Sequence, residues 1–287
     1  MLDRAGCKAM DLRHWFRSQR YELAIRHAHR ASAPLSDENR TSVAPIFFAS
    51  TGRCGTHFAA SFLSQSSKLR ALHEPQPRLE RQAMIGHTAG VEGSPLLTEV
   101  VRAARDHMLA AARSDGKTYV ETSHRMTFLI PAIREAYPKA KFVVLHRSPV
   151  AFARSAIGRQ YFVGNRLDDY RIGSESAAWA GYSNLEKVLK LWNETYEFAL
   201  AAICDTNDKQ RLLLSATDLW SEAGQTTLWD FVHEDTGAPS KGIKFESQAT
   251  NVQQSDIGDD PASLQPSPSM VARLCPVAEQ LGYGDLV

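Results

Sequence analysis

The segment PIFFASTGRCGTH, residues 45–57, decides the fold. Its first part, residues 45–49, is a short apolar run of the length of a buried strand, and apolar residues at helical spacing follow the segment. The turn in between contains Gly52 and Gly55, which let the backbone come close to a ligand. A strand–turn–helix of this kind directs successive backbone N–H groups and the positive end of the helix dipole at one point. The segment therefore predicts a phosphate-binding loop.

Two side chains of this loop are suited to contact an anion. Thr56 can cap the helix and donate to a phosphate oxygen, and Arg53 supplies a charged, forked donor. The usual nucleoside-triphosphate loop, G-x-x-x-x-G-K-[ST], is longer and contains a Lys–Ser/Thr pair that is absent here. A metal-assisted kinase or ATPase is therefore disfavoured. A glycine-rich turn also occurs where a strand and a helix only pack tightly, so the loop alone leaves both interpretations open.

Outward from this loop, apolar strands alternate with helices. Further strands are predicted over residues 69–72, 118–121, 141–146 and 211–214. Helices are predicted over residues 95–113 and 128–137, from Pro149 onward, and over 175–203. This alternation predicts an α/β fold, a single domain with a central parallel sheet and helices on both faces.

The two ends of the chain differ from this pattern. Residues 11–30 are predicted to form a basic helix, so the chain divides into an N-terminal basic helical extension, residues 1–40, and one domain, residues 41–287. The polar segment 251–269 is predicted to be a long loop over the surface or the site.

The composition limits the classes of partner. The chain has 287 residues, of which 43% are hydrophobic, and a formal net charge of +1, so a general nucleic-acid or membrane-surface binder is disfavoured and anion binding must be local. The four cysteines lie far apart and no His/Cys ligand spacing occurs, so we expect neither a disulfide framework nor a metal site, and a cytoplasmic setting fits best. No apolar run approaches the roughly 18 residues of a membrane span, so stable membrane insertion is not expected.

A second motif favours the interpretation of the first loop as a phosphate-binding loop. The apolar strand predicted over residues 141–146 leads directly into Arg147, and Ser155 follows eight residues later on the next helix. An arginine at the carboxyl end of such a strand lies in the crevice where open α/β sheets bind ligands. The hydroxyl of Ser155 can face the same anion.

With both motifs in order, the chain resembles the PAPS-dependent sulfotransferases, the carbohydrate-type and bacterial branch more than the cytosolic one. The resemblance implies a P-loop-like sulfotransferase fold, 3′-phosphoadenosine-5′-phosphosulfate (PAPS) as co-substrate, PAP as product, and no metal. In that family the first loop binds the 5′-phosphosulfate, and the later Arg and Ser bind the 3′-phosphate. The resemblance thus assigns co-substrate binding to Thr51, Gly52, Arg53, Cys54, Gly55, Thr56, His57, Arg147 and Ser155.

The chain departs from the family pattern at Cys54, where Ser is commoner, while Arg53 stands where carbohydrate-type members carry Arg and cytosolic members carry Lys. Weaker matches are His73-Glu-Pro75, Thr217-Asp-Leu219 and Leu281-Gly-Tyr283. The resemblance covers residue 45 to the C-terminus and is specific only at the two phosphate motifs.

Sulfuryl transfer needs stabilisation of the leaving phosphate and a general base for the acceptor hydroxyl. Arg53 and the N–H groups around Gly55 and Thr56 are expected to stabilise the charge on the leaving phosphate. Two residues compete for the role of base. Glu74 lies about as far downstream of the loop as the catalytic Glu of carbohydrate-type members, and His124 resembles the catalytic His of cytosolic members. We favour Glu74, because the arginine-type loop and the Glu-Pro dipeptide indicate the same branch.

Two other classes of protein remain as alternatives. A P-loop nucleotide kinase or phosphotransferase needs a lysine in the loop and an acidic metal ligand at a strand end, where this chain has Arg147. A non-catalytic PAP- or nucleotide-binding protein stays open, because of Cys54 and the undecided base. For an enzyme, the expected acceptor is a carbohydrate or glycolipid hydroxyl, with a small metabolite second and nucleic acid excluded. The sequence does not indicate the oligomeric state.

Overall fold

The computed structural model describes residues 34–164, 168–174, 176–235, 237, 243–245 and 266–286. The predicted helix over residues 11–30 and residues 251–265 of the predicted long loop lie outside them. The last two residues of that predicted loop are the start of a helix, α11 (Pro268–Leu274). Helix α2 (Asp37–Ser42) spans the predicted domain boundary at residue 40.

Five parallel strands form the central sheet, in the order β2-β3-β1-β4-β5. They are β1 (Ile46–Ala49), β2 (Leu69–Leu72), β3 (Thr118–Glu121), β4 (Lys141–His146) and β5 (Arg211–Ser215). All five predicted strands are confirmed to within one residue at each end. Because β1 and β4 are neighbours with Ala49 opposite Val144, the phosphate loop and Arg147 leave the sheet at the same edge.

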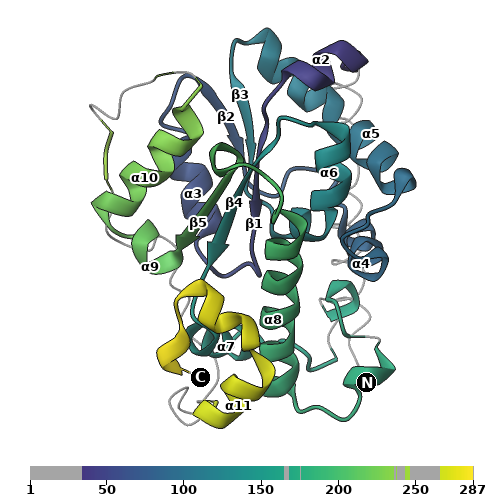
Figure 1. Ribbon diagram of the computed structural model, residues 1–287, viewed down its shortest axis with the longest axis vertical. Helices are drawn as coiled ribbons and strands as arrows, with labels where there is room; N and C mark the ends of the chain where they lie inside the picture. The colour runs from purple at the N-terminus through teal and green to yellow at the C-terminus, as the bar shows by residue number, and fades with distance from the viewer. Residues whose placement is uncertain are drawn as a thin grey trace, which may run out of the picture.

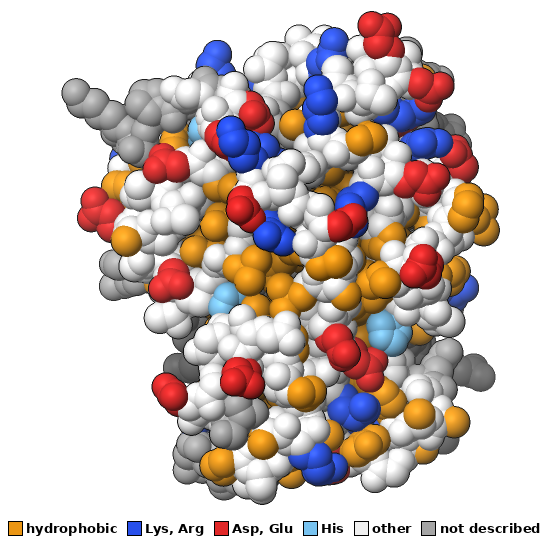
Figure 2. All heavy atoms as spheres, viewed as in Figure 1, with side chains coloured by type: hydrophobic (Ala, Val, Ile, Leu, Met, Phe, Trp, Pro, Cys, Tyr) orange, Lys and Arg blue, Asp and Glu red, His pale blue; other side chains and the backbone are white. Residues whose placement is uncertain are grey.

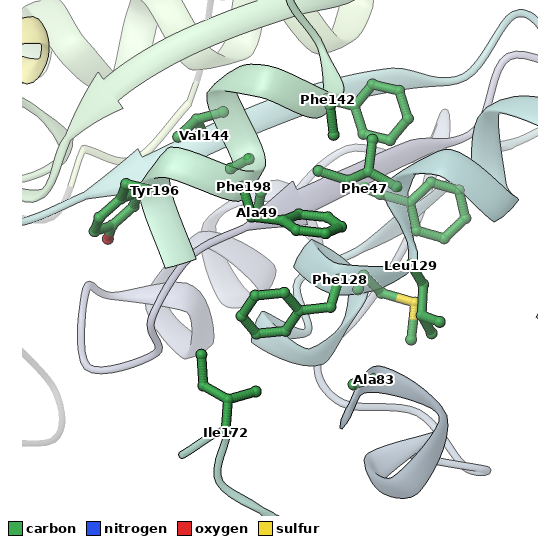
Figure 3. Close-up of a cluster of buried hydrophobic side chains, with 14 of the residues drawn as sticks. Phe47, Ala49, Ala83, Phe128, Leu129, Phe142, Val144, Ile172, Tyr196 and Phe198 are labelled. Atoms are coloured by element: carbon green, nitrogen blue, oxygen red, sulfur yellow. The ribbon is translucent and has the colours of Figure 1, made fainter. Parts of the chain in front are cut away.

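Alternating side chains of the strands build a core on each face of the sheet. Ile46 and Phe48 of β1 pack with α3 (Thr56–Leu63), α9 (Ala216–Leu219) and α10 (Glu222–His233). Phe47 and Ala49 face the opposite cluster, which Figure 3 shows with side chains of β4 and α8. Figure 1 shows α3, α9 and α10 on one side of the strands, and α5, α6 and α8 on the other. The predicted α/β fold with both faces covered is confirmed.

The remaining elements complete these layers. The α-helices are α4 (Glu80–Ala89), α5 (Pro95–Ser114), α6 (Ile130–Ala136), α7 (Pro149–Ile157) and α8 (Asn184–Ala202). The 3₁₀ turns are η1 (His124–Leu129), η2 (Asp168–Tyr170), η3 (Ala177–Trp179), η4 (Asp208–Gln210), η6 (Pro276–Leu281) and η7 (Gly284–Leu286).

Two helix predictions need correction. The helix predicted over residues 175–203 begins only at Asn184, because Ser183 and Glu186 form a capping box that fixes its start. The helix predicted over residues 128–137 is two elements, since the tighter η1 turn precedes α6. The predicted helices over 95–113 and after Pro149 are confirmed as α5 and α7.

Charges of both signs are interspersed over the face drawn in Figure 2, and hydrophobic side chains gather in its middle. This face has no broad basic area, in keeping with the net charge of +1. In the part of the chain that the structure describes, every helix is too short or too polar to cross a membrane.

Candidate functional site

One cavity collects all the residues predicted for the site. It has a volume of about 1040 Å³ and opens where β1, β2, β3 and β4 end. Its lining includes the phosphate loop from Thr51 to His57, and also Glu74, His124, Arg147 and Ser155. A second hollow, of about 810 Å³, lies at the opposite edge of the sheet around Pro45, Thr118 and Lys139, and none of the predicted site residues lines it. The cavity at the carboxyl edge is therefore the candidate site, where open α/β sheets bind ligands.

The loop after β1 has an unusual backbone. Gly52, Arg53 and Gly55 have φ angles of +74°, +59° and +95°, all in the left-handed region. A Cβ atom at position 52 would lie 3.5 Å from Cγ of His124, and one at position 55 only 3.0 Å from Cδ2 of Leu219. Glycine is thus required at both positions by conformation, and at 55 also by space. Successive left-handed residues let neighbouring N–H groups converge on an anion.

The start of α3 differs from the expectation at one residue. Gly55 is the N-cap residue, and Thr56 is the first residue of the helix rather than its cap. Within the described chain no side chain accepts a hydrogen bond from the first turn, so these amides are left for another acceptor. The start of the loop is fixed by Thr127 of η1, because the N–H of Ser50 donates to Oγ1 of Thr127 at 2.9 Å.

The two sequence motifs meet through side-chain contacts. Nη1 of Arg147 donates to the carbonyl oxygen of Arg53 at 3.2 Å, and Nε of Arg53 donates to Oγ of Ser155 at 3.3 Å. The carbonyl of Arg147 is held in turn by Nε1 of Trp192, 2.8 Å away. Strand β4 and helix α7 therefore bring Arg147 and Ser155 against the loop that follows β1.

Four arginines in this part of the cavity have no acidic partner among the residues that the structure describes. Arg53, Arg147, Arg154 and Arg159 all line the cavity, and none forms an ion pair with a carboxylate of the described residues. Burial, followed by the nearby positive charges of Arg159 and Arg147, lowers the pKa of Arg53. An anion placed among these side chains would reduce their mutual repulsion and compensate for the hydration that the buried guanidinium groups have lost.

Sequence reasoning missed Arg159. Its available signal was its place four residues after Ser155, a spacing that puts two side chains on one face of a helix. The arginine lies just beyond the end of α7 and still lines the cavity.

The side chain of Cys54 faces the core. Its sulfur lies 3.3 Å from Oγ1 of Thr51 and 3.3 Å from the hydroxyl of Tyr196, which donates to the carbonyl of Leu145. Burial raises the pKa of the Cys54 thiol. Cys54 thus fills the base of the loop as a small buried residue, with its sulfur in contact with Thr51 and Tyr196.

Glu74 and His124, the two candidates for the base, contact each other. Nδ1 of His124 lies 3.0 Å from Oε1 of Glu74, and Nη1 of Arg125 lies 3.6 Å from the same oxygen. The hydrogen bond from His124, with the charges of His124 and Arg125, lowers the pKa of Glu74 to about 2. Burial in the cavity wall lowers the pKa of His124. The pair is therefore a carboxylate beside a neutral imidazole at neutral pH.

The flanking histidines have different surroundings. Nδ1 of His73 lies 3.0 Å from the carbonyl oxygen of Thr122, and burial lowers the pKa of His73. The rings of His57 and His73 meet edge to face with centroids 5.2 Å apart. Both residues line the cavity.

Comparisons with known proteins agree with this geometry. The model of the sulfotransferase family matches residues 45–214, from β1 to β5. Among solved structures, the sulfotransferase domain from the curacin biosynthetic pathway is similar to this chain, with a TM-score of 0.55 and 12% sequence identity over 84% of this chain and 98% of that one. At this identity the likeness concerns the fold alone. No curated protein sequence matches this one.

Proposed function

The chain belongs to the sulfotransferase family, and from this premise we propose that it transfers a sulfuryl group from PAPS to a hydroxyl group of an acceptor. The contact of Arg53 with both Arg147 and Ser155 carries the proposal. It unites the two phosphate motifs in a cavity lined by four arginines that have no described acidic partner. A donor with one phosphate at the 3′ position and another at the 5′ position fits a site with two groups of anion-binding residues, one in the loop after β1 and one at Arg147 and Ser155.

The donor site divides between two groups of residues. Arg147 and Ser155 would hold the 3′-phosphate, and Arg159 lies close enough to Arg53 to add to the positive field there. The amides of the first turn of α3, with the loop from Thr51 to Gly55, would hold the 5′-phosphosulfate. PAPS supplies the sulfuryl group and a good leaving group, the 5′-phosphate of PAP.

We assign the general base to His124 rather than to Glu74. A carboxylate with a pKa of about 2 is a weak proton acceptor at neutral pH. Because Nδ1 of His124 is turned to Glu74, the lone pair of the neutral imidazole is on Nε2, where Nη1 of Arg125 donates at 3.3 Å. The acceptor hydroxyl would take the place of this contact with Arg125. Glu74 would be a positioning residue: it would hold His124 in the tautomer with the proton on Nδ1 and stabilise the imidazolium that forms.

The transfer step then balances as follows. The acceptor oxygen forms a bond to sulfur while its proton passes to Nε2 of His124. The bond between sulfur and the bridging oxygen breaks, and its electrons stay on the 5′-phosphate of PAP. Arg53 and the amides of the loop stabilise that charge, and losing one such donor typically costs about 3 kcal/mol of transition-state stabilisation. The acceptor, a carbohydrate, glycolipid or small-metabolite hydroxyl, would occupy the part of the cavity beside His124.

The proposal is tested by incubating the protein with ³⁵S-labelled PAPS and an extract of sugars and small metabolites. We expect acceptor-dependent formation of PAP and of a labelled product. Arg147→Ala should abolish most of this activity, whereas Arg134→Ala, which removes a surface arginine paired with Asp205, should not. Transfer from γ-labelled ATP in place of PAPS would instead support the phosphotransferase alternative, and binding of PAP without any transfer would support the non-catalytic one.

A further inference from the structure

Arg171 is a cavity residue that the donor site does not use. It follows the η2 turn and is fixed from behind, because its Nε donates to Oδ1 of Asp168 at 2.9 Å. Its guanidinium carbon lies over the Tyr161 ring, 3.3 Å from the ring centre, in a cation–π contact. Asp168 is itself fixed by the backbone N–H groups of Phe162 and Gly164, at 3.0 and 2.9 Å.

The residue after Arg171 anchors the backbone. Ile172 is buried and belongs to the same hydrophobic cluster as Phe128, and Figure 3 draws the two side chains near each other at the end of that cluster. Arg171 therefore has its main chain, its Nε and one face of its guanidinium all held in place. Such a side chain loses little further entropy when it binds a ligand.

Arg171 lines the cavity, and the two Nη atoms of its guanidinium are its uncommitted end. Its side chain is only 16% exposed, yet neither Nη atom has a hydrogen-bond partner among the described residues. The neighbouring Arg125 differs, because its Nη2 lies 2.9 Å from Glu80 and its Nη1 contacts Glu74. The two Nη atoms of an arginine form a fork that matches the paired oxygens of a carboxylate, sulfate or phosphate.

Arg171 lies on the side of the cavity where His124 is. Burial lowers the pKa of His124, and the positive charges of Arg125 and Arg171 lower it further. The η2 turn also packs against α4, the helix that carries Glu80, the partner of Arg125. Tyr161, the ring that Arg171 contacts, also lies close enough to Arg53 to act on its pKa.

From this placement we infer that the acceptor carries an anionic group close to its reacting hydroxyl, and that the Nη fork of Arg171 binds this group. The inference rests on the proposed function and narrows its acceptor to a class: hydroxyl compounds with a nearby carboxylate, sulfate or phosphate. Uronic acids, sugar phosphates and hydroxy acids have this chemistry. Arg171 is then a specificity-determining residue, and Asp168 and Tyr161 position it.

The test uses protein saturated with PAP, so that the donor site cannot take up the probe. Two matched pairs of probes are titrated and their affinities compared: D-glucuronate against D-glucuronamide, and glucose 6-phosphate against glucose. We expect the charged member of at least one pair to bind about tenfold or more tightly than its neutral partner. This is the gain in affinity expected from one bidentate, charge-assisted pair of hydrogen bonds. Arg171→Gln should reduce this preference to about twofold or less, and Arg171→Lys should keep part of it.

Two controls separate the possible failures. Arg211→Gln, which removes a half-buried arginine of the edge strand β5 that pairs with Asp208, should keep the full preference. Calorimetry with PAP should give the same affinity for Arg171→Gln as for the unchanged protein. If Arg171→Gln weakens PAP binding tenfold, Arg171 belongs to the donor site and the inference is wrong. Equal binding of charged and neutral probes also overturns it, whereas absence of PAP binding by the unchanged protein overturns the proposed function instead.

Discussion

The carboxylate of Glu74 and the imidazole of His124 share a hydrogen bond, so each sets the protonation of the other. The contact holds the pKa of Glu74 at about 2, while burial lowers the pKa of His124. The sequence presents these residues as competitors for one role. Under the proposed function they take different roles, because the pKa of the Glu74 carboxyl lies far below neutral pH, whereas the lowered pKa of His124 leaves its imidazole neutral there.

The pH dependence of transfer follows from this pair. The rate constant kcat/KM should rise with pH as His124 loses its proton, with a midpoint below the ordinary value of about 6.5. Glu74→Gln should move that midpoint to still lower pH, because the negative charge that stabilises the imidazolium is gone. His124→Ala should lower kcat by about 10²–10⁴-fold across the whole range. A flat profile between pH 5 and 8, together with a larger loss in Glu74→Gln than in His124→Ala, would show that Glu74 is the base.

At the scale of elements, the strands were predictable because each is a short, largely apolar run bounded by turn residues. The order of the strands was not, and it decides which loops meet. Since β2 and β3 are parallel neighbours with Leu72 opposite Glu121, the residues just beyond them, Glu74 and His124, leave the sheet side by side. The sequence therefore identified both residues but not their contact. Helices α4 and α10 were missed, and Arg171 was missed because no motif marks it.

A buried ion pair between α5 and β3 also had no sequence signal. Nε and Nη2 of Arg105 donate to the two carboxylate oxygens of Glu121 at 2.6 and 2.9 Å, and both side chains are fully buried. The hydroxyl of Tyr119 donates to the same carboxylate. Nη2 of Arg105 also donates to the carbonyl of Pro77, at 2.9 Å, in the segment that follows Glu74. The pair thus joins helix α5, strand β3 and the segment that follows Glu74.

Removing the charge of Glu121 should be costly. Glu121→Gln leaves the guanidinium of Arg105 buried without a carboxylate, which typically lowers the free energy of unfolding by about 3–5 kcal/mol. Glu99→Gln is the matched control, because Glu99 pairs with Arg102 of the same helix α5 but is 66% exposed, so its loss should change stability by less than about 1 kcal/mol. Urea unfolding followed by tryptophan fluorescence measures both. A loss below about 1 kcal/mol for Glu121→Gln would contradict a structural role for the pair.

For the whole molecule, the net charge of +1 conceals an uneven distribution. The cavity is lined by six arginines and one carboxylate, whereas both signs alternate on the outer face drawn in Figure 2. The arginines of the cavity come from four separated parts of the chain, so composition alone could not reveal their concentration. What the sequence did indicate was a candidate anion site, through two motifs whose residues Arg53, Arg147 and Ser155 contact one another in the structure.

The most direct test of the donor site is calorimetric titration with PAP and then with 5′-AMP, which lacks the 3′-phosphate. We predict that PAP binds far more tightly than AMP, and that Arg147→Ala weakens PAP binding by about 2–3 kcal/mol, roughly a hundredfold, while hardly affecting AMP. Arg211→Ala, which removes a half-buried arginine of β5 that pairs with Asp208, should leave both affinities unchanged. Equal affinities for PAP and AMP in the unchanged protein, or a difference that survives in Arg147→Ala, would contradict the assignment of Arg147 and of PAPS as the donor.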